Sequence, residues 1–339
     1  EDISVTLPDN KPLVLFGPNN VGKSNILSGI NRIIGDRYPT YIEMLDSDYF
    51  QRDSSKYPTA EISAQFSEPI YRDCDHIFNS YGYKGKINDN RLHNQDGDKL
   101  YISNEQRATC QSYLIDADRY IQSALNYSSK YSILSKFSKK IHEHLTDEHK
   151  DDLKSAFEKI KKSFEETDEF REFFKIFSDS LKNEVKGFVH SLEVDFSAYD
   201  PNNYAKSLRI YAKEGKNLRG FEEFGTGEQQ ILLMAFIKSY MEVFTGSNFV
   251  LIIEEPEAHL HPLAQRWLKE YISDICTHGV QVIISTHSAD FIDASYLDGL
   301  VRVYKNKEGI TKVIQLSSRQ LCDFCIDSGV AKTVATPSN

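Results

Sequence analysis

The chain has 339 residues, of which 40% are apolar and 12% aromatic, enough to form the core of one large domain or two ordinary ones. The formal net charge of −10, from 40 basic and 50 acidic residues, argues against a surface that is basic throughout, but it leaves room for a local basic groove. No run of about 18 uncharged apolar residues is present, so no membrane span is predicted. The first residues contain neither an initiator methionine nor a signal peptide, and we expect a chain that starts inside a longer polypeptide.

The five cysteines form an odd and scattered set, unlike the paired framework of a secreted disulfide protein. We therefore expect the reducing cytoplasm as the location. Cys322 and Cys325 have the C-x-x-C spacing of zinc ligands, but no second C-x-x-C or H-x-x-x-H accompanies them. A half-buried pair on a helix is favoured over a metal site.

Apolar and polar residues alternate from Ile3 to Leu7, which predicts a half-buried strand. Asp9 and Asn10 then predict a turn, and the apolar run 13–16 predicts a buried strand. We expect these two strands to form a hairpin that leads into the next segment.

Residues 17–24 match the phosphate-binding pattern G-x-x-x-x-G-K-[ST] at every fixed position. The strand before them and the helical spacing of apolar residues over 26–34 supply the strand, loop and helix that this pattern requires. Glycines let backbone N–H groups close around phosphate oxygens, and the helix N-terminus adds partial positive charge. A nucleoside triphosphate site is therefore favoured over a glycine turn without a ligand.

Two side chains of this loop have expected roles. Lys23 would reach the β- and γ-phosphates, and the Ser24 hydroxyl would ligate Mg²⁺. ATP and Mg²⁺ are thus the predicted cofactors. The other residues expected to contact the nucleotide here are Gly17, Asn19, Asn20, Gly22 and Asn25.

Residues 59–104 are polar and rich in tyrosine, and we interpret them as an antiparallel β arm. Alternation predicts strands over 60–66 and near 99–102, and a short buried strand follows at 112–115. The run 96–98 has the form of a D-x-D metal site, but an Asp-Gly pair between strands favours a turn. Further turns are expected at Gly82, Gly85, Asn88, Asn90 and Gly97.

From about Ser132 to Leu192 the pattern changes to long amphipathic helices with lysine and glutamate between the apolar positions. We interpret this segment as an inserted helical arm, whose phenylalanines pack between helices or form a subunit contact. Its lysines are mixed with acids, so a solvated face is favoured over a nucleic-acid contact. The apolar positions are Leu153, Phe157, Ile160, Phe164, Phe170, Phe174, Phe177, Leu181, Val185, Phe188 and Leu192.

A second glycine-flanked loop, residues 224–230, opens a helix that is apolar all round over 231–237 and is expected to be buried. Such a loop predicts a second anion-binding helix N-terminus in the same chain. One nucleotide does not normally need two.

Two apolar segments predict buried parallel strands that end in polar residues. Residues 249–253 run into Glu254 and Glu255, and residues 280–286 run into His287. Strands of this kind deliver their last residues to the sheet edge where open α/β sheets bind ligands. A lone histidine beside a core strand is usually structural, but the position of His287 matches the chemistry of the two carboxylates.

The order of these motifs resembles ABC-type ATPases of the SMC and RecF kind over nearly the whole chain. More narrowly, E-E-P-E-A-H-L-H-P at 254–262, with S-T-H-S at 285–288, resembles the ATPase domain of the OLD (overcoming lysogenization defect) family. The fold class that this implies is α/β. It is an ABC-type P-loop ATPase head with a mostly parallel core sheet, an antiparallel β arm and an inserted helical arm for dimerisation.

The resemblance implies roles for single residues. Glu254 takes the place of the Walker B carboxylate and would hold Mg²⁺ together with Ser24. Glu255 takes the place of the catalytic carboxylate, and His287 that of the switch histidine. The D-loop would fall at 259–261, where a His-x-His metal site is the less favoured interpretation.

Residues 224–230 take the place of the signature motif, with a glycine where serine is usual, so that Thr226 becomes the candidate hydroxyl for the γ-phosphate. A Q-loop is expected near 116–119. The signature residues implied to contact nucleotide are Gly225, Thr226, Gly227 and Glu228.

The implied organisation is an N-terminal ATPase lobe over 1–130, a helical arm over 131–195 that dimerises, and a C-terminal lobe over 196–339. OLD proteins join this domain to a C-terminal Toprim nuclease and often serve in anti-phage defence. The Glu and Asp-x-Asp that a Toprim domain needs do not follow His287, so we expect that domain beyond residue 339. The implied activity is hydrolysis of ATP to ADP and phosphate, with the nucleotide state controlling the nuclease.

The implied partners are a second copy of the chain, as a homodimer or a higher even oligomer, nucleic acid in the form of DNA, and other defence components, with no membrane. Each chain has two predicted anion-binding helix N-termini but only one complete phosphate loop, which suggests sites shared between two copies. The alternatives are a RecF- or SMC-like repair ATPase without a nuclease, a transporter subunit, which the 254–262 run argues against, and a nucleotide switch that does not hydrolyse ATP.

Overall fold

A computed structural model describes most of the chain. The described residues are 2–35, 38–42, 44–69, 74–84, 87–103, 106–107, 110–115, 132–184, 210–214, 216–220, 223–244, 249–258 and 260–315. The chain forms two compact units. The sheet unit comprises residues 1–120 and 225–339, and the helical unit comprises residues 121–224. The functional division into three parts that we expect from the sequence stays a prediction.

The sheet unit is built on six strands in the order β11-β10-β1-β9-β8-β5. Every neighbouring pair is parallel except β10 with β11, which confirms the mostly parallel core sheet. Central strands of such a sheet are buried on both faces, which explains why their sequences are almost wholly apolar. Their bounds are β1 (Leu13–Phe16), β5 (Gln111–Ile115), β8 (Phe249–Glu254), β9 (Gln281–Thr286), β10 (Leu300–Lys305) and β11 (Thr311–Gln315).

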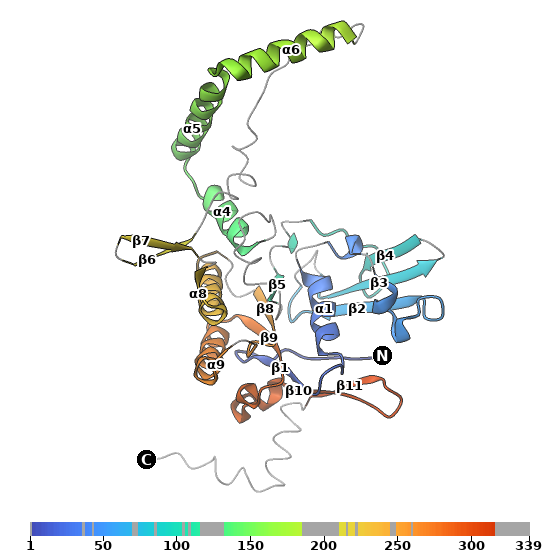
Figure 1. Cartoon of the computed structure of the whole chain (residues 1–339). Helices are drawn as coiled ribbons and strands as arrows, with labels where there is room; N and C mark the ends of the chain where they lie inside the picture. The colour runs from blue at the N-terminus through green and yellow to red at the C-terminus, as the bar shows by residue number, and fades with distance from the viewer. Residues whose placement is uncertain are drawn as a thin grey trace. The chain divides into compact units, whose positions relative to one another are not determined.

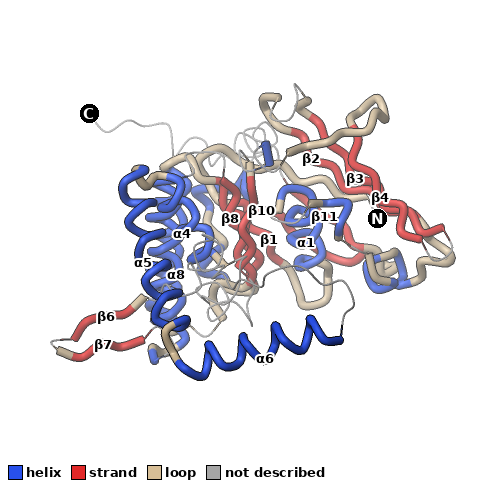
Figure 2. The backbone as a smooth tube through the Cα atoms, turned by 90° about the horizontal axis from the view of Figure 1, so that it is seen from above, coloured by secondary structure: helices blue, strands red, loops and turns tan. Residues whose placement is uncertain are grey.

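Helices cover both faces of this sheet (Figures 1 and 2). Helix α1 (Lys23–Ile34) lies on one face, and α8 (Thr226–Phe244) with α9 (Pro262–Thr277) lies on the other. The hydroxyl of Tyr271 donates to the carbonyl oxygen of Met234 at 3.0 Å and joins α8 to α9. Helix α8 is buried along one side only, since Leu233 is buried while Leu232 is exposed, so the prediction of a helix buried all round is wrong.

The core between α1 and the sheet is a continuous apolar cluster that includes Leu27, Ile252 and Ile283. Removal of these apolar side chains from water is the main source of the free energy that stabilises the folded sheet unit. Cys110 and Cys276 are also buried, and burial raises the pKa of their thiols to about 11 and about 12. Both thiols therefore stay protonated and unreactive at neutral pH.

The predicted β arm is present as a three-stranded antiparallel sheet of β2 (Thr59–Gln65), β3 (His76–Lys84) and β4 (Ile87–His93). The strand predicted near 99–102 is wrong, because only an isolated bridge joins Lys99 to His93. The turn at 96–98 is confirmed, with Gly97 at φ 84°. Gly82, Asn88 and Asn90, expected at turns, lie inside β3 and β4, where pairing with a neighbouring strand fixes their backbone.

The strand predicted over residues 3–7 is also wrong, since this segment pairs with no strand. The side chain of Gln315, at the end of β11, takes the place of a strand partner. Its Oε1 accepts from the N–H of Thr6 at 2.9 Å and its Nε2 donates to the carbonyl oxygen of Thr6. Val5 and Leu7 still pack against the core cluster, which accounts for the alternating pattern.

The helical unit contains α4 (Ile133–Glu143), α5 (Asp147–Glu165) and α6 (Asp168–Glu184), which confirms the predicted helices as far as residue 184. Ser132 and Thr146 cap α4 and α5 by accepting main-chain N–H bonds, as these residue types do at helix starts. A hairpin of β6 (Tyr211–Glu214) and β7 (Asn217–Gly220) completes the described part of the unit.

Short 3-10 turns are also present. They are η1 (Pro39–Tyr41), η2 (Asp46–Asp48), η3 (Phe50–Arg52), η7 (Ala289–Phe291) and η8 (Ala294–Gly299). None of the helices in the described ranges is long and apolar enough to cross a membrane. The segments 116–119 and 185–192 and the pair Cys322 and Cys325 lie outside the described residues.

Candidate active site

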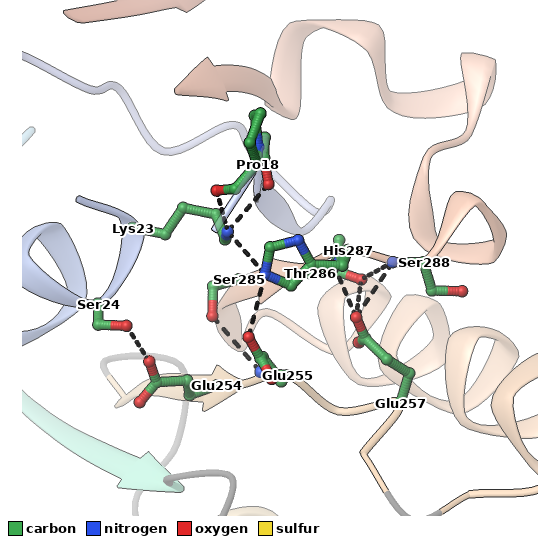
Figure 3. A network of polar contacts seen from close by, with 11 residues as sticks. Pro18, Lys23, Ser24, Glu254, Glu255, Glu257, Ser285, Thr286, His287 and Ser288 are labelled. Atoms are coloured by element: carbon green, nitrogen blue, oxygen red, sulfur yellow. Dashed lines mark hydrogen bonds and ion pairs between the residues drawn. The ribbon is translucent and has the colours of Figure 1, made fainter. Parts of the chain in front are cut away.

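The register of three parallel strands brings the predicted motifs together. Phe16, the last residue of β1, pairs with Thr286 of β9, and Glu254 of β8 pairs with Ser285 of β9. The residues that follow each strand therefore emerge side by side at one edge of the sheet. Figure 3 shows Lys23, Glu255 and His287 gathered there.

The phosphate loop rests on the β10–β11 hairpin. Gly17 and Gly22 have φ angles of 153° and 108°, values that residues other than glycine rarely adopt. A Cβ on Gly17 would collide with the carbonyl oxygen of Val303, and one on Gly22 would lie 2.9 Å from the hydroxyl of Thr311. The two glycines are thus required by the hairpin behind the loop as well as by the path of the loop itself.

Lys23 begins α1 and is buried, with 6% of its surface exposed. Its Nζ donates to the carbonyl oxygens of Gly17 and Pro18, each at 3.0 Å, and lies 2.9 Å from Nε2 of His287. Burial lowers the pKa of Lys23, and the surrounding carboxylates, Glu255 foremost, oppose that shift. Its contacts with the two loop carbonyls and with His287 hold the ammonium group between the phosphate loop and the end of β9.

His287 stands between a cation and an anion. Its Nε2 is 2.9 Å from Nζ of Lys23 and 3.1 Å from Oε1 of Glu255. One ring nitrogen either accepts from the lysine or donates to the carboxylate, and it cannot do both at once. The position of a single proton therefore decides which of the two contacts is a hydrogen bond.

Glu255 adopts a left-handed backbone, with φ at 44°, which is uncommon for a residue with a long side chain. Its N–H donates to the carbonyl oxygen of Ser285 at 2.9 Å, and its carbonyl oxygen accepts from the N–H of Ala258 at 2.9 Å. These two bonds hold the strained residue in place. Strain of this kind persists at functional sites where the surroundings fix the backbone.

Ser24 and Glu254 form a hydrogen bond, in which the hydroxyl donates to Oε1 of the carboxylate. The two oxygens are suited to Mg²⁺, which takes one or two protein ligands and completes its shell with phosphate oxygens and water. The glycine loop, the ammonium group of Lys23 and this oxygen pair together fit a nucleotide with its Mg²⁺. Within the described ranges no cluster of three or more His, Cys, Asp and Glu side chains forms a metal site.

The second glycine loop opens α8 as predicted, but its first turn is occupied by its own acid. Oε2 of Glu228 accepts from the N–H of Gly225 at 3.1 Å, and the carbonyl oxygen of Gly225 accepts from the N–H of Gln229 at 2.9 Å. Gln230 donates from Nε2 to the carbonyl oxygen of Ala258 at 3.2 Å and links the start of α8 to the segment after β8. The loop is thus held to its own chain.

The remaining predicted residues are placed as follows. Asn19 and Asn20 are exposed in the phosphate loop, Asn20 with φ at 60°, and Asn25 is exposed on the first turn of α1. Gly227 lies in the first turn of α8. His261 is described at the start of α9, but His259 is outside the described residues, as is the side chain of Thr226.

Three residues that contact this site were not singled out from the sequence. Glu257 accepts from the segment 286–288, Ser285 accepts from Glu255, and Gln265 bonds to Ser288. Glu257 could have been found as the third acid of the E-E-P-E run. Ser285 could have been found as the first residue of the S-T-H-S run, whereas Gln265 carries no local signal, because its partner Ser288 comes from a distant part of the chain.

Comparison with known proteins identifies the class. The AAA ATPase domain family matches residues 51–292. An OLD nuclease of Thermus scotoductus is 25% identical over 328 residues, which cover 91% of this chain and 60% of that protein. The Old nuclease of Escherichia phage P2 is 35% identical over 98 residues, which cover 27% of this chain and 17% of that protein. The chain therefore spans less than two thirds of these relatives.

Solved structures agree on the fold. An Smc head bound to the C-winged helix domain of ScpA superposes with a TM-score of 0.54 at 20% identity, covering 95% of this chain and 94% of that chain. The Smc head with an extended coiled coil from Pyrococcus furiosus superposes with a TM-score of 0.51 at 16% identity, over 95% of this chain and 94% of that chain. At these identities the likeness concerns the fold alone, and it confirms the ABC-type α/β architecture.

The OLD relatives confirm the narrower resemblance drawn from residues 254–262 and 285–288. With the family match over most of its length, the chain belongs to the AAA ATPase domain family and is similar, within it, to the ATPase domain of OLD nucleases.

Proposed function

We propose that the chain binds ATP with Mg²⁺ and hydrolyses it, and that its nucleotide state controls a nuclease elsewhere in a longer polypeptide. The observation that carries this proposal is the convergence of Lys23, Ser24, Glu254, Glu255 and His287 at one sheet edge, beside a glycine loop. This set supplies a cation that can bind the phosphates, two oxygens for Mg²⁺, a general base and a polar group near the γ-phosphate.

Each residue has a separate part in the proposed reaction. Bound Mg²⁺ would neutralise charge on the phosphate oxygens, and Ser24 with Glu254 would hold it. Glu255 orients the attacking water and accepts its proton, because it projects from the end of β8 beside the loop. Lys23 stabilises negative charge on the γ-phosphate. His287, which contacts both Lys23 and Glu255, donates to the same phosphate or to the water.

The test is ATP turnover of Glu255→Gln. This variant keeps the size of the side chain and removes its basicity, so we expect tight nucleotide binding with turnover lowered about 100-fold or more. Glu270→Gln, an exposed position on α9, is the matched control and should keep full turnover. Equal losses of affinity and turnover in Glu255→Gln would contradict the catalytic role.

The signature loop points to a shared site. The γ-phosphate is proposed to lie between Lys23 of one copy and Gly225, Thr226 and Gly227 of a second, since α1 and α8 lie on opposite faces of the sheet (Figure 1). A two-fold axis would make two such sites equivalent. Hydrolysis would then loosen the pair and move whatever is attached to each chain.

The helical unit is proposed as a constitutive dimer contact. Along α5 and α6 several large apolar side chains are exposed, which is unusual unless another surface covers them. They are Ile160, Phe164, Phe173, Ile176 and Phe177, with exposed fractions of 45%, 50%, 61%, 59% and 43%.

Similarity to OLD nucleases supports the wider proposal, in which the chain works in the cytoplasm, acts on DNA through a Toprim nuclease in the same polypeptide, and serves in anti-phage defence with other components. The second candidate is an ATPase of the RecF or SMC type without a nuclease, with which the shared fold of the Smc heads is also compatible. DNA cleavage by the full-length polypeptide, lost in Lys23→Ala, separates the two.

A further inference from the structure

We propose that Glu257 is a positioning residue for His287, holding the main chain from which the imidazole reaches Lys23 and Glu255. This inference rests on the proposed ATPase function, within which it assigns a task to the third acid of the E-E-P-E run. Glu257 would act through the segment 286–288 and not as a metal ligand or a base.

The contacts of one oxygen carry the argument. Oε1 of Glu257 accepts from the hydroxyl of Thr286 at 2.8 Å, from the N–H of His287 at 2.6 Å and from the N–H of Ser288 at 3.1 Å (Figure 3). Three donors from consecutive residues converge on a single carboxylate oxygen. An ionised oxygen is the strongest acceptor that a side chain offers for such a cluster.

A second bridge joins the same two segments. Gln265, on the first turn of α9, donates from Nε2 to the carbonyl oxygen of Leu260 at 3.1 Å and accepts from the hydroxyl of Ser288 at 3.1 Å. The loop after β9 is thus tied to the segment after β8 at two places. The N–H of His287 is itself one of the groups that Glu257 holds, so the backbone position of His287 follows that of Glu257.

The surroundings of Glu257 argue against the two alternative roles, a ligand of Mg²⁺ and a general base. Its Oε1 is saturated by the three donors, and its Oε2 is buried with no hydrogen-bond partner among the described residues. The oxygens that suit Mg²⁺, on Ser24 and Glu254, lie on the far side of His287 in Figure 3. A buried oxygen without a partner costs free energy.

The test is a double-mutant cycle on ATP turnover in the full chain. Glu257→Ala should lower kcat about 10-fold or more and change KM less than about 3-fold, because nucleotide binding depends on other residues. In a His287→Ala background the same change should have almost no further effect. Coupling of this kind is expected only when one residue acts through the other. Glu270→Ala, an exposed acid on α9, is the matched control.

Glu257→Gln is the conservative variant and guards against misfolding. Its amide oxygen still accepts from Thr286 and the two N–H groups, so it should retain more of the turnover than Glu257→Ala. Independent losses, in which the effects of Glu257→Ala and His287→Ala multiply, would overturn the proposal. A changed Mg²⁺ dependence in Glu257→Gln would also overturn it, in favour of a metal ligand.

Amide hydrogen exchange provides a measure that does not depend on turnover. The N–H groups of His287 and Ser288 should exchange faster in Glu257→Ala than in the parent, while amides in the centre of β8 keep their rates. If the parent does not hydrolyse ATP, the proposed function fails and this exchange measurement still decides whether Glu257 holds the segment. Unchanged exchange at 287 and 288 would refute the inference whatever the turnover.

Discussion

The two helices that begin after a glycine loop differ in what faces their first turn. Helix α1 has no acidic residue of its own there, and Lys23 stands within it, so no acid of its own first turn compensates its positive end. Helix α8 carries Glu228 in its first turn, and that carboxylate accepts from the N–H of Gly225. Two helix starts that both follow a glycine loop can therefore differ in how open they are to an external anion. We expect the first to take a phosphate from solution, whereas the second would have to exchange its own carboxylate, Glu228, for a phosphate.

Among the tests of this comparison, Lys23→Ala should have the largest effect. We expect loss of tight nucleotide binding, because the loop loses its point charge on the β- and γ-phosphates. Isothermal calorimetry with ATP and Mg²⁺ measures it. Lys238→Ala, which removes a half-buried lysine of α8 paired with Asp274, should bind as the parent does. Equal affinity in Lys23→Ala and the parent would show that α1 does not bind phosphate.

Gly227→Asp tests the other helix. A second carboxylate in the first turn of α8 would repel a phosphate brought by another copy, so we expect turnover to fall at least 10-fold while the copy's own loop still binds nucleotide. Calorimetry and turnover on the same preparation separate these effects. Loss of binding together with turnover would mean that both glycine loops face one nucleotide in the same chain.

Mixing the two variants sharpens the result. A Lys23→Ala chain and a Gly227→Asp chain in one dimer would rebuild a single intact shared site, and we expect partial recovery of turnover from two inactive proteins. The matched control mixes each variant with itself. Inactive mixed dimers, verified by tags on the two chains, would rule out the shared site.

Glu228→Gln should produce a smaller change. The amide keeps a hydrogen bond to the N–H of Gly225 and removes the negative charge that an incoming phosphate must displace. We expect the concentration of ATP needed for half-maximal turnover to fall by about 2- to 5-fold, the scale of one charge near a helix end. Glu223→Gln, an exposed acid ahead of the same helix, is the comparison. A rise in that concentration would show that the carboxylate assists the phosphate.

The smallest effect is expected away from both helix starts. A hydrogen bond from Lys269, and further bonds from Ser295, hold the pKa of Asp293 at about 2, below its usual value. A lowered pKa stabilises the fold above the unfolded-state value and loses that effect as the pH falls through about 2. Asp293→Asn should therefore lower the free energy of unfolding by less than about 1 kcal/mol at pH 7, since such pairs are screened by solvent.

Urea unfolding at pH 7, 4 and 3 checks this prediction, because the difference between Asp293→Asn and the parent should shrink as the acid is protonated. Glu308→Gln, in an exposed turn, is the control. Nucleotide affinity should stay unchanged in both. A difference that is constant with pH would indicate lost packing in place of a lost charge.

Local patterns were sufficient for the parts of this site that a single segment defines. The apolar runs at 13–16, 249–253 and 280–286 could be read as buried strands, and residues 17–24 carry their own chemistry in order. The polar residue after each such run lies at the sheet edge because parallel strands share a direction. This is why Glu255 and His287 could be placed together without coordinates.

The other parts depend on partners that are far away in sequence. The support of the phosphate loop by Val303 and Thr311 comes from a hairpin with no motif of its own. The role of Glu257 depends on the register of β9 beside β8, and the segment 3–7 depends on the side chain of Gln315. In each case the local pattern is ordinary, and a contact between distant segments decides its meaning.

The position of β1 in the sheet has a consequence for synthesis of the chain. This strand leaves the ribosome before the helical unit, but its two neighbours, β9 and β10, are translated only after that unit. Its apolar residues and unpaired backbone must therefore be shielded while the helical unit and most of the sheet unit are being made. We expect a nascent chain that stops before residue 281 to bind no nucleotide and to associate with chaperones, which pull-down of stalled ribosomes would show. Nucleotide binding would then begin only when β9 and β10 have joined β1 in the sheet.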